Sequence, residues 1–183
     1  MSIALVVVDL QRDYFPGGSM ELVGIGKAAG NARRLLSAFR DKGLAVVHVQ
    51  HIAARPNATF FLPGTKGAEI HDLVAPVQGE AVVTKYYPNS FRDTNLLDVL
   101  KANGTDSLVI CGAMSHMCID ATTRAAFDLG FRCIVAEDAC ATRDLVFGDR
   151  TVKAADVHAS FMAALSMPYA RVIAAKEAVA EIV

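Results

Sequence analysis

Three side chains that could share one reaction lie at, or just after, the ends of apolar runs: Asp9, Lys85 and Cys118. Cys118 begins a helical pattern, and a helix N-terminus stabilises a thiolate through its unpaired N–H groups and its dipole. A carboxylate at the tip of a buried strand needs a partner or a chemical role, so Asp9 is a candidate general base and acid. The ammonium of Lys85 would favour the anionic forms of both neighbours. The set predicts nucleophilic chemistry by a cysteine.

Each member of this set also has a structural interpretation. The thiol could pack as a small apolar residue on a buried helix face, the carboxylate could cap the following turn, and the ammonium could reach solvent. Cys111 and Cys133 lie inside apolar runs, so we predict structural roles for both. Cys140 competes with Cys118 as the nucleophile because we expect it just past a strand end.

The histidines raise the question of a metal site, but their spacing does not support one. His48 and His51 are separated by two residues near a strand end, and on a strand that odd spacing points side chains to opposite faces. We predict structural or pocket-lining roles for them, with no metal and no cofactor. His116 could orient a substrate or bond the local backbone. The glycines of residues 24–30 are a weak match to a dinucleotide-binding loop.

Candidate substrate-binding residues surround the expected strand ends. Most aromatic side chains in a domain belong to its core, so only some of those near the loops are expected to line a pocket. The candidates are Gln11, Phe15, Phe61, Tyr86, Phe91 and His116.

Apolar runs that alternate with helical patterns predict one α/β domain over residues 1–183. The predicted strands span 3–9, 44–50, 81–85, 107–111, 132–137 and 171–174. The predicted helices span 27–41, 94–102, 118–129, 151–165 and 177–182. Strands that are apolar on both faces favour a mostly parallel sheet covered by helices on each side. In such sheets the functional residues gather at the carboxyl ends of the strands, where the three candidates lie.

Composition excludes several classes of function. The chain has 183 residues, of which 53% are hydrophobic and 20% charged, and its formal net charge is −1. This balance indicates an ordered globular protein, with no basic patch for nucleic acid and no membrane partner. The N-terminal apolar run is short and lacks a basic segment before it, so we expect no export signal, a cytoplasmic location and reduced cysteines.

Four segments spread along most of the chain carry a family resemblance. They read "VVVDLQRDYF", "FLPGTKGAEIH" leading into "APVQGEAVVTK", "FRDTNLLDVL" and "VICGAMSHMCIDATTRAAFDLGF". In this order and spacing they resemble the isochorismatase-like cysteine hydrolases, a superfamily of isochorismatases, nicotinamidases and N-carbamoylsarcosine amidohydrolases. The resemblance implies a Rossmann-like three-layer α/β/α fold whose six-stranded parallel sheet has the order 3-2-1-4-5-6.

The resemblance also implies roles for particular residues. Asp9, Lys85 and Cys118 would form a catalytic triad, and the peptide bond between Ala113 and Met114 would be cis. The backbone N–H groups of Met114 and Cys118 would form an oxyanion hole. Members of the family commonly self-associate, so a dimer or tetramer is expected.

Several reactions remain open at this stage. The cysteine favours cleavage of a C–N bond in a small amide, ureido or carbamoyl compound through a thioester on Cys118. An isochorismatase-type vinyl-ether hydrolase, a non-catalytic binding relic of the fold and a thiol redox sensor are the alternatives. The Asp-x-His element of metal-dependent nicotinamidases is replaced here by "HVQHIAARP", which argues against a metal.

Overall fold

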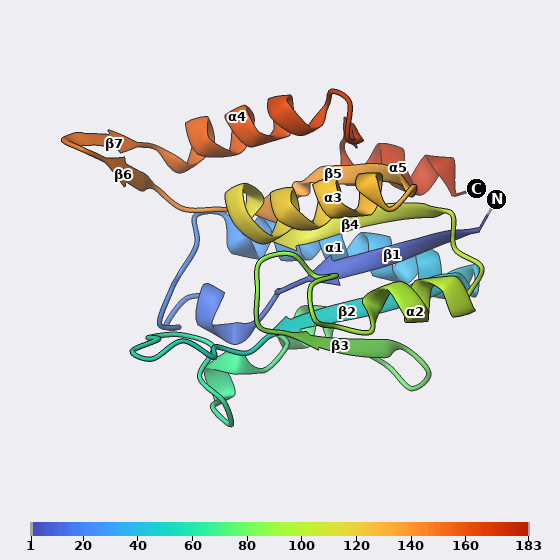
Figure 1. Cartoon of the computed structure of the whole chain (residues 1–183), viewed down its shortest axis with the longest axis horizontal. Helices are drawn as coiled ribbons and strands as arrows, with labels where there is room; N and C mark the ends of the chain where they lie inside the picture. Colours follow the sequence, from blue (N-terminus) through green and yellow to red (C-terminus); the bar gives the residue numbers. More distant parts are fainter. Residues whose placement is uncertain (1, 183) are drawn as a thin grey trace.

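A six-stranded parallel sheet forms the middle layer of the computed structural model, which describes residues 2–182 (Figure 1). Its order is β3-β2-β1-β4-β5-β8. This confirms the predicted fold class and order, because β8 is the sixth strand of the sheet. The strands are β1 Ile3–Val8, β2 Ala45–His51, β3 Ala81–Lys85, β4 Ser107–Ala113, β5 Arg132–Ala141 and β8 Arg171–Ile173.

Two apolar cores lie on the two faces of this sheet. Along β1, Leu5 and Val7 point into one core, whereas Val6 and Val8 point into the other. All four side chains are buried, which is why the strand reads as a continuous apolar run without alternation. The central position of β1 places its carboxyl end, and therefore Asp9, in the middle of the sheet's functional edge.

The helices divide between the two faces. Helices α1 and α5 supply side chains to the first core, and α2, α3 and α4 to the second. Figure 1 shows α2 and α3 on the near side of the sheet and α1 behind it. The helices are α1 Ile25–Asp41, α2 Leu96–Ala102, α3 Asp120–Asp128, α4 Ala154–Leu165 and α5 Ala175–Glu181.

A two-stranded antiparallel hairpin, which the sequence analysis missed, precedes α4. It consists of β6 Leu145–Phe147 and β7 Arg150–Val152, and it projects from the body at the left of Figure 1. The predicted start of the helix at residue 151 is therefore wrong. Asp144 accepts hydrogen bonds from the backbone N–H of Ala154 and from the ammonium of Lys153, which fixes the helix start after the hairpin.

The strand β5 runs further than predicted. Its register against β4 shifts between Ile110 and Gly112, so that Gly112 pairs with Cys140. The extra residues of β5, which include the acidic pair Glu137 and Asp138, are accommodated at this irregularity. The strand therefore continues past the acidic pair. Cys140 therefore lies inside the strand, buried, with its Sγ donating to the carbonyl of Ala136 at 3.4 Å. The prediction that it lies past the strand end is wrong.

Gly112 makes the close approach of β4 to β1 possible at the functional edge. Its φ is 128°, and a Cβ at this position would overlap the carbonyl of Val8. We expect Gly112→Ala to lower the free energy of unfolding by about 3 kcal/mol or more, through backbone strain and overpacking together.

Urea unfolding tests this expectation, with Gly26→Ala as the matched control. Gly26 lies in helix α1 with open space around the missing Cβ, so alanine there should stabilise by about 0.5–1 kcal/mol. Equal effects of the two substitutions would contradict the role given to Gly112.

Candidate active site

The three candidate catalytic residues come from three neighbouring strand ends. Asp9 directly follows β1 with a left-handed backbone, φ 53°, and Lys85 is the last residue of β3. Cys118 lies in a wide helical turn, Ser115–Ile119, that follows β4 and leads into α3. Parallel strands that end at one edge therefore bring together residues that are far apart in the chain.

Asp9 and Lys85 form a fully buried ion pair. The Nζ atom of Lys85 lies 2.8 Å from Oδ2 of Asp9, and both side chains are 0% exposed. Nζ also donates to the carbonyls of Tyr87 at 3.1 Å and Pro88 at 3.2 Å. The carbonyls orient the ammonium toward the carboxylate. A buried charge is tolerated only with such compensation.

The sulfur of Cys118 lies beside this pair. Ligand atoms of Asp9, His51 and Cys118 all lie within 4.8 Å of one another, and Cys118 is only 5% exposed. Burial raises the pKa of the Cys118 thiol to about 12, and the carboxylate of Asp9 raises it as well, while Lys85 lowers it. Burial therefore favours the thiol over the thiolate that a helix start would stabilise. The thiol needs a base, and Asp9 is the adjacent one.

The neighbouring charges also set the state of Lys85 and His51. Burial alone lowers the pKa of Lys85, but the carboxylate of Asp9 and the sulfur of Cys118 outweigh it, and the net pKa is raised. Burial lowers the pKa of His51, Asp9 raises it, and Lys85 lowers it again, with a net decrease. His51 is therefore neutral in the resting site, and its Nδ1 atom accepts from Nζ of Lys85 at 3.4 Å.

The backbone around Cys118 departs from a regular α-helix. The peptide bond between Ala113 and Met114 is cis. The N–H of Ile119 donates to the carbonyl of Met114 at 3.2 Å, a five-residue step that widens the turn. The helix predicted from residue 118 thus becomes α-helical only at Asp120. N–H groups in the first turn of a helix lack partners inside that helix, and Cys118 lies in this turn.

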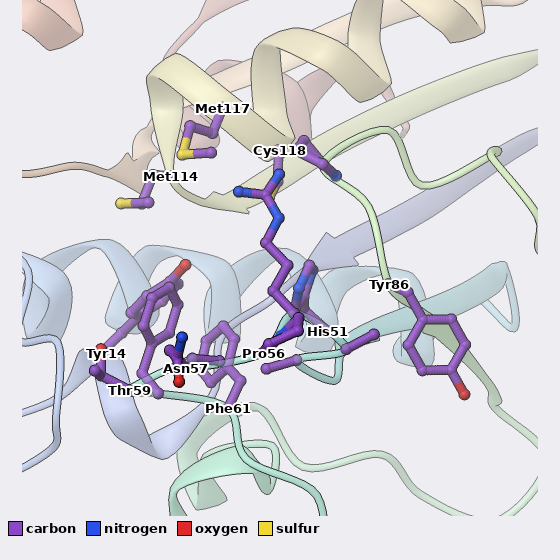
Figure 2. Close-up of a pocket in the computed structure, with 16 residues that line it drawn as sticks. Tyr14, His51, Pro56, Asn57, Thr59, Phe61, Tyr86, Met114, Met117 and Cys118 are labelled. Atoms are coloured by element: carbon purple, nitrogen blue, oxygen red, sulfur yellow. The ribbon is translucent and has the colours of Figure 1, made fainter.

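A cavity of about 310 Å³ is lined in part by Cys118. In Figure 2, Met114 and Met117 lie on the same side of the cavity as Cys118. Side chains from the opposite wall face them, and Tyr86 lies at one end. The labelled residues of the opposite wall are Tyr14, His51, Pro56, Asn57, Thr59 and Phe61.

Only part of the predicted substrate-binding set lines this cavity. Phe61 and Tyr86 do. Gln11 does not: its amide donates to the carbonyls of His51 at 2.8 Å and Ala68 at 2.7 Å, and its oxygen accepts from the N–H of His51 at 2.8 Å. Gln11 instead holds β2 and the following segment against the end of β1.

The three remaining candidates also lie outside the cavity lining. Phe15 stacks on His71, with ring centroids 3.7 Å apart. Phe91 packs near Phe131 in the second core. The Nδ1 atom of His116 lies 2.6 Å from Oγ1 of Thr142. Proximity in sequence to a strand end placed these residues near the site but could not show which way they point.

The sequence analysis missed most of the wall opposite Cys118. That wall is built by the segment after β2, including residues 53–61, together with Tyr14. Two hydrogen bonds fix the ends of this segment. The N–H of Ala53 donates to the carbonyl of Phe61 at 2.9 Å, and the N–H of Phe61 donates to Oδ2 of Asp13 at 2.6 Å. The sequence signal that could have identified this segment is its position directly after a predicted strand. A segment that follows a parallel strand begins at the edge where the functional residues gather.

Asp9, His51 and Cys118 are residue types that could bind a metal. The ammonium of Lys85, however, contacts both Asp9 and His51. A cation placed among the three would meet this buried positive charge at short range. The donor set does not fit a metal ion while Lys85 is protonated.

The other histidine of the pair lies away from the site. His48 is buried, and its Nε2 atom lies 2.8 Å from Oε2 of Glu80. Glu80 also accepts from Nε of Arg40 at 2.7 Å and from the N–H of Val77 at 3.0 Å. Burial raises the pKa of Glu80, but these hydrogen bonds outweigh it and lower the pKa to about 2.

This shift predicts a specific dependence of stability on pH. The carboxylate of Glu80 stabilises the fold above its ordinary pKa of 4.5, and this contribution is lost as pH falls from there toward about 2. The difference in free energy of unfolding between wild type and Glu80→Gln should shrink across that range. Urea unfolding at a series of pH values measures it, and a constant difference would contradict the assignment.

The fold and site together define a three-layer α/β protein with a cysteine, a carboxylate and an ammonium buried at the carboxyl edge of a parallel sheet. Residues 3–176 match the family model described as the isochorismatase domain. The isochorismatase family protein YddQ of Bacillus subtilis is 52% identical over 172 residues, covering 94% of this chain and 96% of that one. The chain belongs to the isochorismatase family of hydrolases.

Two further comparisons support the family assignment. The crystal structure of an isochorismatase hydrolase from Oleispira antarctica has a TM-score of 0.95 and 54% identity, covering 98% of this chain and 96% of that one. Maleamate amidohydrolase of Pseudomonas putida is 32% identical over 154 residues, covering 76% of this chain and 72% of that one.

Proposed function

We propose that the protein is a cysteine amidohydrolase that cleaves the C–N bond of a small amide, ureido or carbamoyl compound. The observation that carries this proposal is the juxtaposition of the Cys118 sulfur, the Asp9 carboxylate and the Lys85 ammonium beside a cavity. A buried thiol next to a carboxylate has a base within reach, and the ammonium of Lys85 holds that carboxylate in place.

The first half of the reaction forms a thioester. Asp9 takes the proton of the Cys118 thiol as the sulfur attacks the carbonyl carbon. The N–H groups of Met114 and Cys118 donate to the oxyanion of the tetrahedral intermediate. Asp9 then gives its proton to the leaving nitrogen, the C–N bond breaks, and an amine or ammonia departs.

The second half returns the enzyme to its starting state. Asp9 takes a proton from water as the oxygen attacks the thioester carbonyl. The C–S bond breaks, the acid departs, and the proton passes from Asp9 back to the sulfur of Cys118. Lys85 stays protonated throughout and holds the carboxylate of Asp9 at 2.8 Å.

The comparisons support amide hydrolysis at this level of detail. Maleamate amidohydrolase is named for hydrolysis of a small amide, and it matches 76% of this chain. A cavity of about 310 Å³ also suits a small substrate rather than a peptide chain.

A screen for ammonia release tests the proposal. Small primary amides, ureido and carbamoyl compounds are offered to wild type and to Cys118→Ala, and we expect at least one to be hydrolysed by wild type alone. Consumption of isochorismate that survives Cys118→Ala and fails with Asp9→Ala would instead identify a vinyl-ether hydrolase. Turnover of none of these compounds would favour a binding relic.

The cytoplasmic location and the dimeric or tetrameric state stay predictions. Across residues 2–182, no helix has both the length and the apolar character needed to cross a membrane. Light scattering on the purified protein measures the oligomeric state directly.

A further inference from the structure

The first residue of the turn that carries Cys118 is bonded to β5 and α4 by its side chain. Ser115 is 0% exposed, and its hydroxyl donates to the carbonyl of Ala141 at 3.3 Å. Nδ1 of His158, from helix α4, lies 2.8 Å from the same hydroxyl oxygen. Because a carbonyl only accepts, both contacts are made when the hydroxyl donates to Ala141 and Nδ1–H donates to the hydroxyl. His158 therefore completes the hydrogen bonding of a buried serine.

The order of these groups is that of a hydrolytic triad, but the serine is not placed to act as a nucleophile. Nε2 of His158 lies 3.7 Å from Oε2 of Glu137, so a serine, a histidine and a carboxylate follow one another. Ser115 has no exposed surface, however, and it is not among the described residues that line the cavity beside Cys118 or a second cavity of about 360 Å³ beside His158. The cluster therefore holds the turn in place and does not supply a second nucleophile.

Two consecutive residues of the turn are held by side-chain contacts. Nδ1 of His116, the residue after Ser115, lies 2.6 Å from Oγ1 of Thr142, which directly follows β5. Ser115 lies between Met114 and Cys118, the two residues whose N–H groups are proposed to bind the oxyanion. A shift of the backbone at Ser115 would therefore move these donors away from the position that the oxyanion occupies.

We propose that His158 is a positioning residue that holds the oxyanion-binding turn in place through the hydroxyl of Ser115. The proposal rests on the amide hydrolysis proposed above and assigns a further residue to it. An oxyanion forms only after the sulfur attacks, so a misplaced donor weakens the transition state more than the bound substrate. Loss of the contact between His158 and Ser115 should therefore lower kcat and leave KM nearly unchanged.

Substitutions of His158 separate the hydrogen bond from the volume of the side chain. His158→Leu fills much of the same space without a polar atom, and we expect kcat to fall roughly 10- to 100-fold while KM stays within about threefold. His158→Asn places an amide at the branch where Nδ1 lies, so it should recover kcat to within about fivefold of wild type. The hydroxyl of Ser115 keeps Ala141 as its acceptor in both variants, so the fold should survive.

Ser115→Ala tests the path from His158 to the turn. It should lower kcat to about the level of His158→Leu, and the double variant should fall no further, because both changes break one contact. Ser160→Ala, at an exposed position of α4, is the control for a change in that helix and should leave kcat within about twofold. Equal losses in His158→Leu and His158→Asn, multiplied losses in the double variant, or an unchanged kcat in His158→Leu would overturn the role of His158.

Hydrogen exchange separates failure of this proposal from failure of the amide hydrolysis, because it needs no substrate. The N–H groups of Met117 and Ile119 donate to the carbonyl of Met114 at 3.0 and 3.2 Å within the turn. We expect these amides to exchange at least about fivefold faster in His158→Leu than in wild type, and to regain protection in His158→Asn. That result, with no amide hydrolysed in the broad screen, would uphold the role of His158 in holding the turn and reject the amidohydrolase. Unchanged exchange in His158→Leu would reject the role of His158 whether or not an amide is hydrolysed, and amide turnover alongside it would uphold the amidohydrolase.

Discussion

Replacing Cys118 with alanine is expected to lower kcat/KM for the amide substrate by roughly 10⁴-fold or more. The substitution removes the atom that attacks the carbonyl carbon, and neither Asp9 nor Lys85 can replace it as a nucleophile of equal strength. The buried position of Cys118 limits the damage to packing, because alanine removes a single heavy atom. Ammonia release under saturating and subsaturating substrate measures both kcat and KM.

Cys133→Ala provides the matched control for this prediction. Cys133 is also a buried cysteine, but it lies in β5, and its Sγ contacts the carbonyl of Phe131 at 3.6 Å. We expect its kcat/KM to stay within about threefold of wild type, with a modest loss of stability. An equal loss of activity in the two variants would show that Cys118 acts through packing rather than chemistry.

Lys85→Met is expected to have the largest effect on stability. The substitution leaves the carboxylate of Asp9 buried without its partner, 2.8 Å from where the ammonium lay. Removing one member of a buried pair costs about 3–5 kcal/mol in the free energy of unfolding. Activity should be lost as well, because the carboxylate of Asp9 would lose the contact at 2.8 Å that holds it in place beside Cys118.

A double variant separates the cost of the unpaired charge from the loss of packing. Asp9→Asn combined with Lys85→Met removes both charges, so it should recover much of the lost stability while remaining inactive. Lys101→Met, at an exposed position of α2, should change stability by no more than about 0.5 kcal/mol. Urea unfolding of the three proteins measures these differences. If Lys85→Met were as stable as Lys101→Met, the buried pair would not be needed for the fold.

Much of the fold could be predicted because the strands are unusually clear in the sequence. β1 is apolar on both faces, and that pattern has few alternatives to a buried parallel strand. The strand ends then placed Asp9, Lys85 and Cys118 at one edge, where the structure brings them together. The chemistry of the candidate site followed from this rule and from the family resemblance.

The features that were missed depend on contacts that a local pattern does not contain. The continuation of β5 to Ala141 depends on a register shift against β4, and the β6–β7 hairpin depends on pairing between short exposed segments. The ionisation of Cys118 depends on how deeply the folded chain buries it. Much of the cavity wall comes from the long segment after β2, which has no regular structure. A local pattern could not show which residues of that segment, Arg55 among them, line the cavity.

The covalent intermediate is the central claim, and mass spectrometry of acid-quenched protein tests it most directly. Wild type is mixed with the amide found in the screen, quenched within the first turnover, digested and mapped. We predict that the peptide containing Cys118 gains the mass of the acyl group, and that hydroxylamine removes this added mass. Release of ammonia in the first turnover with the Cys118 peptide unmodified would contradict the account.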